Sequence, residues 1–377
     1  MHSYRRQLGY LLFALHLVGL HPAAGAPVEL AKFTGLTSCQ SSSCHGGGAG
    51  RDQCDIWSTR DFHARAFAIL LTSRSQRIAE TLHFDKSDAS ANPRCTVCHS
   101  PMQSVPQDRL LPAAHADQGV SCENCHAPAE NWLRSHTRHD YTYFQRVASG
   151  MNDLRNLYQR ANTCVACHEN LPSDMASAGH PELIFELDSQ LVSEPPHWHE
   201  SDPWAGLHSW LTGQAVAFRE ETWRMIKEPG ESARWESLGW LLQEVTAQLK
   251  TLPDLEMPKP PATPQQLGRL QAQSNRLARA APGFTWTPGI SQQLFRQLTK
   301  TGDQLRRVNG GDQQVHRAEV ITQSLDRLLA ELAAHQVAPP GADKGVDNLF
   351  ADLRQPLYFN RDKFCADLDA LAGMAAK

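Results

Sequence analysis

Three short motifs in the first half of the chain have the residue types and spacing that attach haem. Each reads C-x-x-C-H, and they are Cys95-Thr-Val-Cys98-His99, Cys122-Glu-Asn-Cys125-His126 and Cys164-Val-Ala-Cys167-His168. In such a motif the two thiols form thioethers with the vinyl groups of haem c, and the following histidine ligates the iron from the proximal side. Paired C-x-x-C units also form zinc sites, but zinc does not require a histidine directly after every second cysteine. The three motifs therefore predict three covalent haems.

A fourth motif has a longer loop between its cysteines. Cys39-Gln-Ser-Ser-Ser-Cys44-His45 reads C-x4-C-H and keeps the Cys-His ending. By itself this spacing fits a disulfide pair as well as haem, but beside three regular motifs it predicts a fourth haem c group. Cys54 and Cys365 are left over, and since neither precedes a histidine they are either free or paired with each other.

Each haem iron has a second axial position on its distal side. A histidine there gives a low-spin, low-potential electron carrier, whereas a vacant position can bind a substrate. Outside the motifs, the first half of the chain and its border offer His63, His83, His115, His136, His139, His180, His197, His199 and His208. Nearby methionines that could ligate instead are Met102, Met151 and Met175. The excess of histidines favours histidine on both sides of most irons.

Several segments resemble the cytochrome c-554 family of multihaem proteins. They are Trp57–Ala66, Gly119–His126, Trp132–Thr137, Ala178–Leu183 and Pro195–Trp198. The resemblance covers about residues 36–200, because the order of the motifs and the histidines between them both agree. It implies a wrapped tetrahaem core with haems in close pairs. The chain departs from larger relatives in having no fifth C-x-x-C-H between Trp235 and Leu242.

The same resemblance implies distal roles for four histidines, which are His63, His136, His180 and His197. His139 is the rival of His136, and His115 and His199 are the rivals of His197. The residues alone leave these alternatives open, as they leave open which distal histidine serves which haem.

Residues 1–26 have the three parts of an export signal. Arg5 and Arg6 are basic, Leu8 to Leu20 is apolar, and Ala24-Gly25-Ala26 is a cleavage site of small residues. The apolar part is too short for a membrane span, so we expect no integral span after cleavage. Pro27 leaves a shifted cleavage or a retained anchor open. The signal predicts a periplasmic or extracellular protein.

The charge of the chain bears on its partners. Residues 1–26 contain two arginines and no acidic residue, so their removal changes the formal charge from −4 to −6. Ionised haem propionates add about two negative charges per haem. We therefore expect a redox partner protein with a basic docking face. There is no basic block or aromatic–basic patch, which excludes nucleic acid as a partner.

Composition divides the mature chain into two domains of a mainly α protein. Residues 27–203 contain all four motifs and many glycines and prolines, which predicts a loop-rich, wrapped tetrahaem cytochrome c core. Its porphyrins would supply the apolar interior, with short helices over about 59–82 and 153–161. Residues 204–377 contain no Cys-His pair but carry apolar residues at helical spacing, which predicts a haem-free helical bundle. The expected helices span about 204–225, 235–249, 265–280, 290–305 and 315–332, with a last helix capped by Asn360.

These features favour an extracytoplasmic c-type cytochrome that transfers electrons between redox partners through four covalently bound haems. Two alternatives differ from this carrier. One is a haem oxidoreductase that acts on a small nitrogen or sulfur compound at one five-coordinate haem, so the assignment as an enzyme stays open. The other is a subunit of an extracellular haem filament, and the oligomeric state is likewise open.

Overall fold

The computed structural model describes residues 30–48, 50–85, 88–169, 171–198, 200–230, 232–259 and 261–376. Ala31–Lys377 forms one compact unit. The predicted export signal and His199 lie outside the described residues. The protein is mainly α, as predicted, and the one β feature within the described ranges is an isolated bridge between Phe33 and Leu110. No helix in these ranges is both long and apolar enough to cross a membrane.

The helix predicted over residues 59–82 is wrong, because this stretch is broken twice. It contains α1 (Gln53–Arg60), a 3-10 turn, α2 (Ala66–Leu70) and α3 (Ser73–Thr81). Asp61 is extended, and its carboxylate accepts a hydrogen bond from the backbone nitrogen of His63, 2.8 Å away. Thr72 is also extended and caps α3. Short polar side chains of this kind compete with the helical ladder, and they end the helix at both positions.

Three short helices carry the regular haem motifs, and each ends at its motif histidine. They are α4 (Pro93–His99), α5 (Cys122–His126) and α7 (Leu157–His168). Helix α7 starts four residues later than predicted, because Asn156 caps it and accepts from the backbone nitrogen of Gln159. The other short helices of this half are α6 (Tyr143–Ala148), α8 (Ser173–Ser177) and α9 (Leu187–Ser193).

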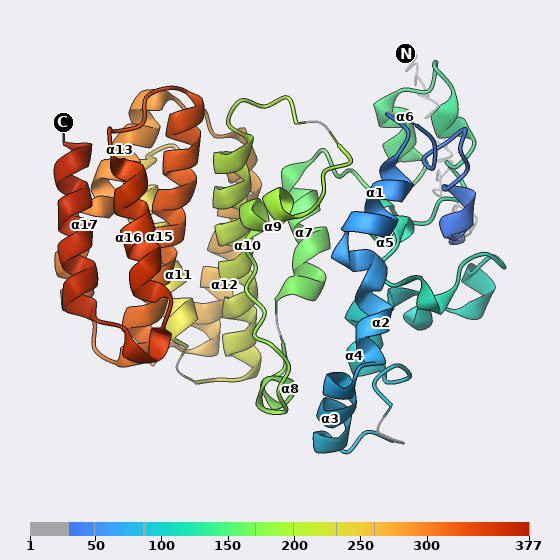
Figure 1. The fold of residues 1–377 in the computed structure, drawn as a ribbon, viewed down its shortest axis with the longest axis horizontal. Coiled ribbons are helices and arrows are strands. Elements are labelled where there is room, and N and C mark those ends of the chain that lie inside the picture. The colour runs from blue at the N-terminus through green and yellow to red at the C-terminus, as the bar shows by residue number, and fades with distance from the viewer. Residues whose placement is uncertain are drawn as a thin grey trace, which may run out of the picture. The chain divides into compact units, whose positions relative to one another are not determined.

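The second half consists of longer helices that pack side by side (Figure 1). They are α10 (Ala205–Lys227), α11 (Ala233–Gln248), α12 (Pro264–Ala280), α13 (Pro288–Thr299), α14 (Gly302–Arg306), α15 (Gly311–Ala334), α16 (Ala342–Leu353) and α17 (Arg361–Ala375). Asn360 caps α17 as predicted. The predicted helix over 290–305 is two helices, broken at Lys300 and Thr301, and α16 was not predicted.

Apolar side chains are distributed unequally between the two halves. The main core runs from Ala161 to Ala375 and includes Trp210, Phe218 and Leu238. The separate core of the first half contains only five buried residues, which are Leu70, Ala79, Ala89, Cys95 and Met175. So small a hydrocarbon core cannot by itself offset the conformational entropy of an ordered chain of this length, which implies an additional apolar component.

Helix α10 joins the two halves. It contacts α7, which carries the last haem motif, as well as α9 and α12. Tyr158 of α7 donates a hydrogen bond to the Asn275 side chain of α12 at 2.7 Å. The Arg219 guanidinium of α10 donates to the Asn162 side chain of α7 at 2.8 Å. The motif helix α7 is therefore held by the bundle through polar contacts as well as through Ala161 and Val165 in the core.

Glu186 makes stability depend on pH at this junction. Its buried carboxyl accepts a hydrogen bond from the Gln214 side chain, and burial, reinforced by the negative charge of Asp188, raises its pKa to about 8. An acid whose pKa is higher in the folded state holds its proton better when folded. The free energy of unfolding should therefore fall by on the order of a few kcal/mol as the pH rises from about 4.5 to 8.

We predict that Glu186→Gln flattens this part of the pH profile, because the substituted side chain has no proton to lose. Urea unfolding followed by circular dichroism between pH 5 and pH 8 measures the slope. Glu256→Gln is the matched control at an exposed position and should leave the slope unchanged. An unchanged slope in Glu186→Gln would contradict the assignment.

Candidate haem-binding sites

The structure places each motif histidine opposite one histidine from elsewhere in the chain. The ring centroids lie 6.2 Å apart for His45 and His136, 6.3 Å for His99 and His180, 6.4 Å for His126 and His197, and 5.9 Å for His168 and His63. We call these pairs sites 1, 2, 3 and 4, in the order of their motifs along the chain. Each of the four histidines that were predicted to be distal lies opposite one motif histidine.

The spacing of the pairs fits an ion held between two imidazoles. Metal–nitrogen bonds of about 2.0 Å on both sides of one ion separate the two ring centroids by about 6.3 Å. Rings in direct stacking contact lie closer, as Trp204 and His335 do at 3.8 Å. The observed 5.9–6.4 Å is therefore the separation that two axial ligands of one iron require.

The ring nitrogens nearer the backbone are occupied in six of the eight histidines. Nδ1 of His99, His136 and His180 lies 3.1, 3.1 and 2.7 Å from a backbone carbonyl oxygen. Nδ1 of His45 lies 2.9 Å from Oε1 of Gln53, whereas Nδ1 of His168 lies 3.2 Å from the side-chain nitrogen of Gln190, which donates to it. A histidine that donates through Nδ1 presents Nε2 to a metal, and the hydrogen bond fixes the orientation of its ring.

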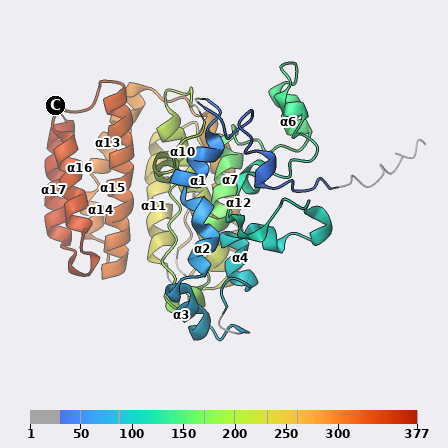
Figure 2. The same ribbon diagram turned by 45° about the vertical axis from the view of Figure 1, so that its right-hand side comes forward.

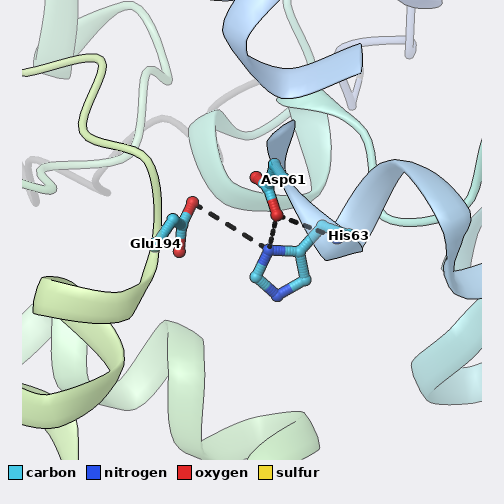
Figure 3. A group of neighbouring side chains, drawn as sticks. All are labelled: Asp61, His63 and Glu194. Atoms are coloured by element: carbon cyan, nitrogen blue, oxygen red, sulfur yellow. Dashed lines mark hydrogen bonds and ion pairs between the residues drawn. The ribbon is translucent and has the colours of Figure 1, made fainter. Parts of the chain in front are cut away.

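The sixth of these, His63, has a carboxylate on its Nδ1 (Figure 3). Oδ1 of Asp61 lies 3.0 Å away and Oε1 of Glu194 lies 3.9 Å away, while the other ring nitrogen points away from both. Ligand atoms of the three residues lie within 4.8 Å of one another. Such a carboxylate–histidine pair makes a ligating Nε2 more basic. Burial, together with the Asp61 charge, raises the pKa of Glu194 to about 7.

Burial keeps several of these imidazoles neutral, and the neutral ring is the form that ligates a metal. It lowers the pKa of His126 to about 4 and also lowers the pKa of His99, His168 and His197. Burial likewise raises the pKa of the Cys125 thiol to about 12 and that of Cys164 to about 11. Buried, neutral imidazoles and thiols of this kind are what we expect of residues that contact an apolar porphyrin.

Cysteines of different motifs lie against each other and define which sites are neighbours. The Cys39 and Cys122 side chains lie close enough to interact, and so do those of Cys98 and Cys167. Cys125 and Cys164 interact electrostatically. The Asn152 side-chain amide donates to the carbonyl oxygen of Cys125 and to the Thr163 hydroxyl, which joins the third motif to α7. These contacts place the sites in the order 1, 3, 4, 2.

Apolar side chains next to the ligand positions are exposed. The exposed fractions are 78 % for Phe62, 52 % for Val97 and 70 % for Val192. Phe62 precedes His63, Val97 lies inside the second motif, and Val192 is two residues from Glu194. Apolar groups at such positions need a cover. Together with the small core of this half, they fit a porphyrin at each site.

The rival histidines have other environments. His115 and His139 are exposed, and His208 lies 2.7 Å from the carbonyl oxygen of Phe284. His83 has a positive φ of 54° in the turn after α3. Since a histidine faces each motif histidine, none of the three methionines occupies that position, and Met102 and Met175 are buried apolar residues.

The two remaining cysteines are free and lie in different environments. Cys54 is buried on α1 near Cys39. Cys365 is buried on α17, where its thiol faces the carbonyl oxygen of Gly302 at 3.6 Å. The alternative that they pair with each other is wrong. The supporting residues Asp61, Gln190 and Glu194 were not predicted, and only Asp61, two residues before His63, carried a local signal.

Glu123, the second residue of the third motif, anchors the start of the described chain. Its buried carboxylate accepts hydrogen bonds from the backbone nitrogens of Thr34, Gly35 and Ala129 at 2.7–3.0 Å. Gly35 has a φ of +83°, and a Cβ there would lie 2.0 Å from the carbonyl oxygen of Ala113. The carboxylate thus holds a strained, close-packed turn beside site 3.

We predict that Glu123→Gln lowers the free energy of unfolding by about 3 kcal/mol, because an amide turns one acceptor into a donor facing backbone N–H groups. The control is Glu130→Gln, since Glu130 is exposed and accepts from the backbone nitrogen of Lys32. Glu130→Gln should lower the free energy of unfolding by less than about 1 kcal/mol. Urea unfolding followed by the haem absorbance compares them, and equal losses would contradict the role of Glu123.

Comparison with known proteins agrees with this part of the chain. Residues 38–127 match the family model described as cytochrome c554 and c-prime. The match contains the first three haem motifs and His63. No curated protein and no solved structure matches the chain. The resemblance seen in the sequence is thereby confirmed over this segment, which is similar to the cytochrome c554 family of c-type cytochromes and so indicates covalently bound haem c and a role in electron transfer.

Proposed function

We propose that the protein is a periplasmic or extracellular tetrahaem cytochrome that transfers electrons between redox partner proteins through four covalently bound haems. Residues 27–203 hold the haems, and residues 204–377 form a haem-free domain that supports α7 and the chain around site 4. The observation that carries the proposal is the set of four histidine pairs with ring centroids 5.9–6.4 Å apart.

The proposed attachment residues are the eight motif cysteines Cys39, Cys44, Cys95, Cys98, Cys122, Cys125, Cys164 and Cys167. The proposed axial ligands are the proximal His45, His99, His126 and His168 and the distal His136, His180, His197 and His63, respectively. Haem iron supplies a one-electron couple, and the protein sets its ligation, spacing and electrostatic environment.

The residues of each site are arranged to hold a haem, and they leave no open position at which a substrate could react. Two imidazoles would fill both axial positions of each iron, and their Nδ1 hydrogen bonds resist rotation of the rings. A filled distal position excludes a substrate and leaves outer-sphere electron exchange. Imidazole on both sides also keeps the reduction potential low, whereas a methionine ligand would raise it. The pairs therefore favour the electron carrier over the oxidoreductase.

Carbon monoxide tests this function. The dithionite-reduced protein should show no change in its haem spectrum when the gas is added, because each distal position already has a histidine. Binding of one equivalent, followed by turnover of hydroxylamine, nitrite or a sulfur oxyanion, would show that the protein is an enzyme instead.

A further inference from the structure

One segment of the haem-bearing half has a positive formal charge, whereas the segments before and after it in this half are negative. Residues 131–168 contain five arginines, two aspartates and no other charged residue of either sign, so their formal charge is +3. Residues 27–130 have a formal charge of −2, and residues 169–203 contain eight acidic residues and no lysine or arginine. A basic surface in such surroundings is a local feature that the net charge of the chain conceals.

The exposed charges of this segment lie on one excursion of the chain, residues 134–155, which we call the basic arm. Arg134, Arg138 and Arg155 are exposed. Arg138 forms an ion pair with Asp140 in which both side chains are exposed, with fractions of 64 % and 70 %, so its guanidinium can exchange Asp140 for another carboxylate at little cost in free energy. In both views the α6 part of the arm stands clear of the long C-terminal helices (Figures 1 and 2).

The same arm carries an exposed apolar residue. The Phe144 side chain on α6 is 82 % exposed. Docking surfaces of electron carriers need only a small apolar centre with a charged rim, because charge complementarity determines the encounter rate and the orientation. Phe144 with Arg134, Arg138 and Arg155 has this composition.

The arm is ordered by its own contacts before any partner arrives. Thr142 and Gln145 form a reciprocal capping box at the start of α6. The Tyr141 hydroxyl bonds the Ser149 hydroxyl, and the Arg155 guanidinium lies 4.4 Å from the centre of the Tyr143 ring. A surface that is already ordered loses little conformational entropy when a partner binds.

Both ends of the arm are attached to haem-binding sites. At its start, His136 faces His45 in site 1. Just before its end, the backbone nitrogen of Asn152 donates to the carbonyl oxygen of His126 in site 3 at 3.0 Å, and the Asn152 side chain donates to that of Cys125. Site 1 is also the first in the order 1, 3, 4, 2. A protein docked on the arm would therefore lie next to the end of the row of sites.

We propose that the basic arm is the docking surface for an electron-transfer protein that presents a carboxylate-rich face. This inference rests on the proposed function and adds a partner of opposite charge to the one expected from the net charge. The partner is recognised by its carboxylates at the three arginines and by an apolar contact at Phe144.

An acidic plant-type [2Fe–2S] ferredoxin is the probe, since its potential of about −400 mV allows it to reduce low-potential haems. One electron passes from the reduced cluster to one ferric haem, and stopped-flow absorbance of the holoprotein follows it. At about 10 mM ionic strength the Debye length is about 30 Å, and the rate should fall about fivefold or more as salt rises to 0.3 M.

The test variant is R134E/R138E/R155E, and the matched control is R269E/K344E/R354E at exposed positions of the bundle. Both change the net charge equally. At low salt we expect the arm variant to react about tenfold more slowly than the unmodified protein and the control less than threefold more slowly. Phe144→Ser should slow the reaction about threefold at every ionic strength, because salt does not screen an apolar contact.

Equal slowing of the two triple variants, or a rate for the unmodified protein that rises with salt, would overturn the docking proposal. So would a failure of the ferredoxin to react. Dithionite, a small reductant that needs no docking, should reduce all haems in every variant. Incomplete reduction by dithionite would instead count against the electron carrier itself, so the two failures are distinguishable.

Discussion

His136→Ala should convert one of the four proposed haems into a site that binds carbon monoxide. Its ring lies 6.2 Å from that of His45, and its Nδ1 is held 3.1 Å from the carbonyl oxygen of Trp132. Without this imidazole, nothing at the same position can ligate, so the haem becomes high-spin with an open distal face. The reduced variant should bind one equivalent of the gas, and the spectra of the other three haems should be unchanged.

The matched control is His139→Ala, which removes an exposed histidine three residues further along the chain. It should leave every haem low-spin and closed to the gas. If His139→Ala opens a haem while His136→Ala does not, the pairing at site 1 is wrong. Reduced-minus-oxidised spectra and gas titrations of both variants make the comparison.

Replacing both Cys39 and Cys44 by alanine should remove one covalent haem of four. These two residues are the only thiols of the C-x4-C-H motif, and with both absent no thioether can form at site 1. Mass spectrometry of the mature protein should show four haems in the unmodified chain and three in the double variant. His45 and His136 remain, so any haem still bound there would be released by acid extraction.

Cys54→Ala is the control, because Cys54 is also buried near Cys39 but is not followed by a histidine. It should retain four covalent haems. A double variant that keeps four, or an unmodified protein with three, would show that the longer motif does not hold a haem.

Local spacing made the attachment motifs and the bundle helices predictable. A C-x-x-C-H motif carries its chemistry within five residues, and an apolar stripe at helical spacing needs only its own helix. Helix α16 was missed because glycine stands where its helix faces α17. A Cβ at Gly345 would lie 2.7 Å from the Leu371 side chain, so close packing requires glycine at one of the four buried positions of α16.

The pairing of the histidines could not be predicted from spacing. Site 4 joins His63 to His168 across 105 positions of the chain, and the pairing depends on how the loops between them fold. The supporting groups have the same origin, since Glu194 reaches His63 from far along the sequence. Even the end of α1 at Asp61 has a long-range cause, because the Asp61 carboxylate binds the backbone nitrogen and Nδ1 of His63, which lies opposite His168. Long-range contacts of this kind leave little local pattern.

The electron paramagnetic resonance spectrum of the fully oxidised holoprotein tests most directly whether four haems each have two histidine ligands. It counts low-spin and high-spin ferric haems in one sample, with the haem content fixed by mass spectrometry. We predict low-spin signals that account for four haems per protein and no high-spin signal. A high-spin signal that integrates to one haem per protein would contradict the four filled pairs and would support an enzyme with an open site.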